Sequence, residues 1–173
     1  AGLALKTDFY RENHMNTLQH VPLWVWALLA LLLLLGWRQS HTTRVPRRRL
    51  VLISLAWTVY ALLSLGQLLQ PLGLLLPGLL LWAACNAASS WLARPLFTPA
   101  LAHEGRHLLV PGSWAPLTLY LLMFGLRFAH GMFAALQPEW AQKASPLLAL
   151  AAGAGLLTGL INARSLRLLQ APR

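Results

Sequence analysis

The sequence predicts an all-α integral membrane protein, a single bundle of five transmembrane helices. Of the 173 residues, 57% are hydrophobic and only 10% are charged, whereas soluble domains are about 45–50% apolar and about 25% charged. In addition, five apolar stretches reach the roughly 17 residues that a membrane-spanning helix needs. Between the third and fourth helices we expect a short cytoplasmic loop, in which a hairpin is one arrangement that the sequence allows.

The N-terminal segment is treated separately from the bundle. Met15, followed by NTLQHVPLWVWALL, resembles a natural start of a chain, and residues 1–14 differ from the rest of the sequence. We therefore expect residues 1–14 to be an added leader, with a genuine N-terminal extension as the alternative. The single transmembrane domain is then residues 15–173.

The five predicted helices follow one another with short connections. They cover residues 21–37, 50–69, 72–93, 114–136 and 146–169. Only the segment QPLG separates the second helix from the third, which predicts a tight helical hairpin. Pro77 either kinks the third helix or lies in the first turn of a helix that begins nearer Gly78, where a proline costs little.

The charges of the connecting segments predict the orientation. The loop at residues 38–49 contains five arginines, so the positive-inside rule places it in the cytoplasm. The QPLG turn carries no charge and is expected outside, whereas Arg94 and Arg106 place the next loop inside. The loop at 137–145 has Lys143 as its basic residue and is expected outside. The C-terminal tail contains arginines and is expected inside. The N-terminus is thus predicted outside and the C-terminus inside.

The formal net charge of +10 does not indicate a nucleic-acid partner, because the basic residues lie mainly between apolar runs. Cys85 is the one cysteine of the sequence, which excludes an intrachain disulfide.

The segment HEGRH contains the HExxH pattern of zinc proteases, in which two histidines one helical turn apart bind the metal. Here His103, Glu104 and His107 lie between prolines, and Gly105 interrupts the motif. The segment is better interpreted as a hairpin or extended loop, with RHLLV as a strand. We therefore expect no metal site and no cofactor.

Arg127 and His130 stand three residues apart in the apolar run LLMFGLRFAHGMFAAL. A charged side chain at this depth costs at least about 2.5–3.5 kcal/mol and raises the hypothesis of a functional site. By helical spacing Tyr120 lies on nearly the same face. None of the four acidic residues falls within a predicted helix, so Arg127 lacks an intramembrane ion pair unless Glu139 folds back.

Several partners therefore remain open for Arg127: helix carbonyls, water, the amides of Asn86 and Asn162, a lipid phosphate or a bound anion. The ordinary interpretation is snorkelling of Arg127 to the headgroups. The functional alternatives are binding of an anionic lipid or small ligand, and a proton-linked path through His130. Haem ligation is weakly indicated, because a second axial ligand beside His130 could come only from His20, at the outer end of the first predicted helix.

The last predicted helix carries a face of small residues. Gly155 and Gly159 form a small-xxx-small pair, which Ala151 and Ala163 extend. Such faces let two helix backbones approach closely in lipid. We expect these residues to form helix–helix contacts.

The sequence also resembles a family of small bacterial inner-membrane proteins known only as a domain of unknown function. The residues that carry the resemblance are HVPLWVWALLALLLLLGWRQS, RRRL, VPGSWAPLTLYLLMFGLRF and GLLTGLINARSLRLL. The resemblance implies a multi-pass protein of a Gram-negative inner membrane, with a basic residue recurring at the position of Arg127. It implies no activity.

The leading hypothesis is a non-enzymatic protein that binds a membrane lipid or a small anionic ligand around Arg127 and His130, as a permease component or accessory subunit. The first alternative is a structural or interaction subunit that forms homo-oligomers through Gly155 and Gly159. The second is a membrane enzyme that uses His130, or His103 and His107.

Overall fold

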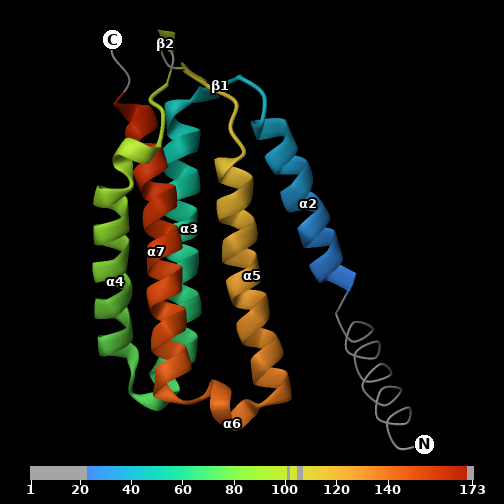
Figure 1. Cartoon of the computed structure of the whole chain (residues 1–173), viewed down its shortest axis with the longest axis vertical. Coiled ribbons are helices and arrows are strands. Elements are labelled where there is room, and N and C mark those ends of the chain that lie inside the picture. The colour runs from blue at the N-terminus through green and yellow to red at the C-terminus, as the bar shows by residue number, and fades with distance from the viewer. Residues whose placement is uncertain (1–22, 101, 105–106, 171–173) are drawn as a thin grey trace, which may run out of the picture.

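The computed structural model describes residues 23–100, 102–104 and 107–170. The expected leader, the first two residues of the first predicted helix, His20 and Arg106 lie outside them. The described chain is mainly helical (Figure 1). Its long helices are α2 (Leu23–Gln39), α3 (Arg47–Leu69), α4 (Leu75–Leu92), α5 (Ala115–Leu136) and α7 (Ala144–Leu169).

Four of these helices, α3, α4, α5 and α7, are long and apolar enough to cross a membrane. Helix α2 has 17 residues, the lower limit for a span. The chain thus has four helices suited to crossing a membrane, and a crossing by α2 remains a prediction.

Helix α7 is the centre of the bundle. It packs along α4 over most of its length, and α3 and α5 also contact it. Leu150, Ala151 and Ala154 of α7 form a buried cluster with Leu65 of α3 and Trp82 of α4. Helices α5 and α2 pair with each other on one side of this core (Figure 1).

Helices α3 and α4 form a tight hairpin. The 3-10 helix η1 (Gln70–Leu72) ends at Gly73, whose φ of 66° lies in the left-handed region that glycine adopts at little cost. Pro77 lies in the first turn of α4, which begins at Leu75. At this position its missing N–H costs no intrahelical hydrogen bond.

A small antiparallel sheet covers the end of the bundle near the C-terminus (Figure 1). Its strands are β1 (Thr43–Pro46), β2 (Ala102–Glu104) and β3 (His107–Val110), in the order β1-β3-β2. Leu108 and Val110 are buried against Leu50 of α3 and Leu168 of α7. The sheet thereby ties the segment before α3 to the segment before α5. The short helices η2 (Arg94–Leu96) and α6 (Pro138–Ala141) complete the described chain.

Candidate functional site

The structure separates the residues that the sequence grouped into one site. Arg127 and His130 lie close enough for electrostatic interaction, and Arg127 also interacts with Tyr60 of α3. Within the described part of the chain, the Arg127 Nε and Nη2 atoms and the His130 Nε2 atom are buried without a hydrogen-bond partner. Glu139 lies on α6, beyond the end of α5.

The two asparagines belong to a polar cluster inside the α3–α4–α7 core. The Asn162 Nδ2 atom donates to the Asn86 Oδ1 atom at 3.2 Å, and the Ser54 hydroxyl donates to the Asn162 Oδ1 atom. These contacts pair both polar atoms of the Asn162 amide and the amide oxygen of Asn86 across helix interfaces. They connect three helices, as interhelical polar groups in membranes commonly do.

The small face of α7 lies against α4 of the same chain. A methyl group built on Gly155 would lie 2.5 Å from the Trp82 carbonyl oxygen, and one on Gly159 would overlap the Asn86 carbonyl and the Ser89 side chain. Ala151 and Ala163 are fully buried on this helix. In this structure α4 of the same chain covers both glycines, and oligomerisation through Gly155 and Gly159 stays a prediction.

The described residues of the histidine motif lie on strands. His103 and Glu104 belong to β2 and His107 to β3, and Glu104 pairs with His107 across the ladder and His103 with Leu108. The zinc-protease arrangement needs both histidines on one face of a helix. This backbone does not provide that face.

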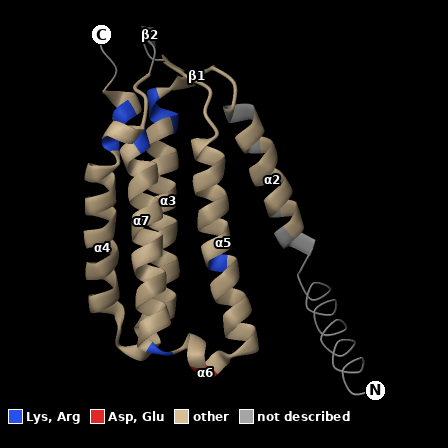
Figure 2. Ribbon diagram, viewed as in Figure 1, with Lys and Arg blue, Asp and Glu red and all other residues tan. Residues whose placement is uncertain are grey.

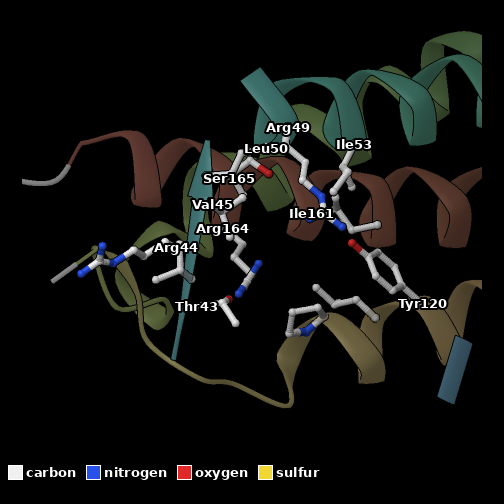
Figure 3. Close-up of a pocket in the computed structure, with 13 residues that line it drawn as sticks. Thr43, Arg44, Val45, Arg49, Leu50, Ile53, Tyr120, Ile161, Arg164 and Ser165 are labelled. Carbon is white, nitrogen blue, oxygen red and sulfur yellow. The ribbon is translucent and has the colours of Figure 1, made fainter. Parts of the chain in front are cut away.

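A basic pocket lies at the sheet end of the bundle, where α3, α5, α7 and β1 meet. Its volume is about 300 Å³. The polar side chains that line it are Thr43, Arg44, Arg49, Tyr120, Arg164 and Ser165. In Figure 3 the Arg49 side chain extends toward the Tyr120 hydroxyl, and Arg164 enters the same cavity from α7.

Three helix ends bring these side chains together. Arg49 lies in the first turn of α3, which begins at Arg47 directly after Pro46 of β1. Tyr120 lies five residues after the start of α5, and Arg164 five residues before the end of α7. At 1.5 Å per residue both are about 8 Å from that end of their helices. The pocket is thus recessed into the bundle.

Arg49 and Arg164 bring positive charge into this pocket. Both Arg49 and Arg164 interact electrostatically with Tyr120. Among the described residues, no Asp or Glu lines the cavity. The first turn of α3 holds three arginines and no acidic residue, at the helix end where the macrodipole already disfavours a cation. An anion in the pocket would relieve this repulsion.

The donors suit one class of ligand. Guanidinium groups present planar sets of N–H donors that match phosphate and carboxylate oxygens, and such charge-assisted hydrogen bonds are roughly twice as strong as neutral ones. The hydroxyls of Thr43 and Ser165 line the same cavity and supply further donors. The pocket therefore has the chemistry of an anion-binding site.

The fold and the pocket define a small helical protein with four helices suited to crossing a membrane and a basic pocket at one end. The chain belongs to a family of unknown function, DUF6622, whose model matches residues 3–173. This match confirms the resemblance to an uncharacterised family. It includes most of the segment expected to be a leader, and that expectation remains a prediction. No curated protein and no solved structure matches the chain.

Proposed function

We propose that this protein is a non-enzymatic, five-span membrane protein that binds an anionic group, a phosphate or a carboxylate, in the basic pocket at its cytoplasmic end. The anion belongs either to a lipid headgroup or to a small soluble ligand. Binding thus takes place at Arg49 and Arg164, rather than at Arg127 and His130.

The distribution of charge supports this orientation. Most described Lys and Arg residues gather at the end that carries the sheet and the C-terminus (Figure 2). Lys143 and Glu139 lie at the opposite end, around α6. The positive-inside rule places the arginine-rich end in the cytoplasm. With α2 as the first span, the N-terminus lies on the outer side of the inner membrane and the C-terminus on its cytoplasmic side.

The cluster of Arg164 and Tyr120, with Arg49 at its exposed rim, carries the proposal. Arginines that serve only as topological anchors extend into water or headgroups. Arg164 is instead half-buried in a cavity between three helices, where charge is less well screened than at an open surface, and Arg49 lines the same cavity. A bound anion supplies a counter-charge to Arg49 and Arg164.

Titration calorimetry with ethyl phosphate in mild detergent tests the proposal. The phosphate should bind the wild type, and Arg49→Gln or Arg164→Gln should weaken binding about tenfold or more. A hydrogen bond to a charged group contributes about 1.5–3 kcal/mol, and about 1.4 kcal/mol corresponds to a factor of ten. Arg48→Gln is the matched control, because Arg48 is exposed like Arg49 but is not among the residues that line the pocket.

Equal loss of affinity in all three variants would show that only net charge matters, and would contradict a built site. Absence of binding to ethyl phosphate and to acetate would contradict the proposal altogether.

A further inference from the structure

A second cavity lies directly beside the basic pocket, between α3 and α5. Its volume is about 430 Å³. Its lining is mostly apolar and includes Leu32 of α2, Trp57 of α3 and Phe124 of α5. The α3 and α5 backbones make little direct contact, so the cavity between them is lined by side chains. We call this cavity, together with its opening, the apolar groove.

The basic pocket and the apolar groove share a wall. Ile53 lines both of them. Trp57, which lines the groove, stacks on Tyr120, which lines the pocket, with ring centroids 5.2 Å apart and an interplanar angle of 16°. The two cavities therefore follow each other along the bundle, and an aromatic pair marks the passage from charged to apolar lining.

One continuous stripe on α3 spans both cavities. Arg49, Ile53, Trp57 and Tyr60 follow at helical spacing. From Arg49 to Tyr60 the helix rises about 17 Å. One leaflet of a bilayer has about half of the roughly 30 Å hydrocarbon core, or about 15 Å. The stripe thus matches the depth of a single leaflet, with the charged end at the predicted cytoplasmic surface.

Arg127 closes the apolar stretch on α5. It lines the groove seven residues beyond Tyr120, about 10 Å further along the helix axis. Its Nε and Nη2 atoms are buried without a hydrogen-bond partner among the described residues. A hydrocarbon chain that reached this guanidinium would offer it no hydrogen-bond acceptor. Arg127 therefore limits the length of chain that the groove accepts.

We infer that the ligand is an anionic lipid of the cytoplasmic leaflet, with its phosphate in the basic pocket and one acyl chain in the apolar groove. This inference rests on the proposed function of the pocket. Moving the acyl chain from the bilayer into the groove brings little hydrophobic gain, because both surroundings are apolar. The acyl chain instead gains close packing against Trp57 and Phe124. Headgroup binding thus supplies the affinity, and the groove selects a phosphate that carries a chain.

Two probes with the same headgroup test this inference: ethyl phosphate, which reaches only the pocket, and dodecyl phosphate, which extends into the groove. Binding is measured in one detergent for the wild type and for Ala56→Phe. Ala56 lines the groove and is exposed, so a phenyl ring there fills the groove without entering the buried core. Ala83→Phe is the matched control on the exposed surface of α4.

Ala56→Phe should weaken dodecyl phosphate binding at least about fivefold, a loss of packing that corresponds to about 1 kcal/mol. It should leave ethyl phosphate binding unchanged, and Ala83→Phe should change neither. Unchanged dodecyl phosphate binding in Ala56→Phe would overturn the groove as the chain site while the proposed function stands. Failure of both probes to bind the wild type would instead refute the proposed function.

A measurement on the wild type alone covers the case in which Ala56→Phe does not fold. A dodecyl phosphate with a photoreactive group near the chain end should crosslink to peptides that contain residues 53–60 or 123–127. Crosslinks confined to α4 or α7 would overturn the inference. Arg164→Gln should abolish the specific crosslink, because it removes the anchor of the headgroup.

Discussion

The substitution Gly155→Ala tests a close backbone contact between α7 and α4. A methyl group on Gly155 would lie 2.5 Å from the Trp82 carbonyl oxygen and 3.0 Å from the Cys85 Cβ atom. Because one of these atoms is backbone, a side-chain rotation cannot relieve the contact, and α4 must move away from α7. Overpacking of this kind costs about 1–3 kcal/mol, occasionally more. Alanine returns about 1 kcal/mol of helix propensity.

The net effect expected for Gly155→Ala is a loss of up to about 2 kcal/mol of unfolding free energy. For a chain of this size that lowers the melting temperature by up to about 8 °C, at roughly 2–4 °C per kcal/mol. Cys85 provides the assay, since it is the one cysteine of the sequence and packs at this contact. Its reaction with a thiol-specific fluorophore during heating reports the separation of α4 from α7.

Gly131→Ala is the matched control for this experiment. Gly131 lies on α5, and a methyl group there meets no atom within 4 Å. The control should melt at the wild-type temperature or slightly above it, because alanine favours the helix by about 1 kcal/mol. If Gly155→Ala also melts higher than the wild type, α4 and α7 are not in backbone contact and the packing argument is refuted.

Two further substitutions examine the polar groups inside the bundle. Asn162→Leu removes the hydrogen bonds to Asn86 and from Ser54. Interhelical hydrogen bonds in membranes average about 0.6 kcal/mol and reach about 1.7, so the melting temperature should fall by a few degrees, and an unchanged value would contradict a structural role. Arg127→Leu should leave ethyl phosphate binding unchanged and raise thermal stability, because it removes buried guanidinium nitrogens that lack a hydrogen-bond partner among the described residues. Loss of phosphate binding in Arg127→Leu would return the site to the position expected from sequence alone.

Hydrophobic runs and turn residues are sufficient to predict the helices. Helix α5 covers residues 115–136, against a prediction of 114–136, and α7 begins two residues before its predicted start. Pro77 and Gly73 are local signals whose effects do not depend on tertiary structure, and both occur where the predicted hairpin turns. Helix boundaries depend mainly on nearby residues, which explains this agreement.

The basic pocket is not predicted from the sequence, because it depends on how distant helix ends meet. The sequence places Arg49 in a loop and Arg164 near a tail, where both serve only to infer orientation. Helix α3 begins before Arg49 and α7 extends beyond Arg164, so both arginines project from regular helices. Arg164 does carry a usable signal, since it lies inside the predicted last helix. The rotation of each helix about its axis decides which charges face inward, and spacing along one chain does not specify it.

Arg127 attracts the sequence-based hypothesis because a buried charge in an apolar run is conspicuous. In the structure Arg127 lies near Tyr60 and His130, whereas Asn86 and Asn162 form a separate cluster. Tyr120 shares a helix with Arg127, yet it faces the basic pocket. Helical spacing correctly puts both residues on one side of α5, and it does not reveal that this side borders two different cavities.

Native mass spectrometry of the protein, purified from membranes in mild detergent, tests the anion site most directly. The wild type should retain an anionic phospholipid that survives gentle activation, and so should Arg127→Ala and Arg48→Gln. The retained mass should disappear in Arg164→Gln, with the protein still folded by its melting curve. Retention of the same lipid by Arg164→Gln together with its loss from Arg127→Ala would contradict the account, because Arg127 would then hold the ligand in place of the basic pocket.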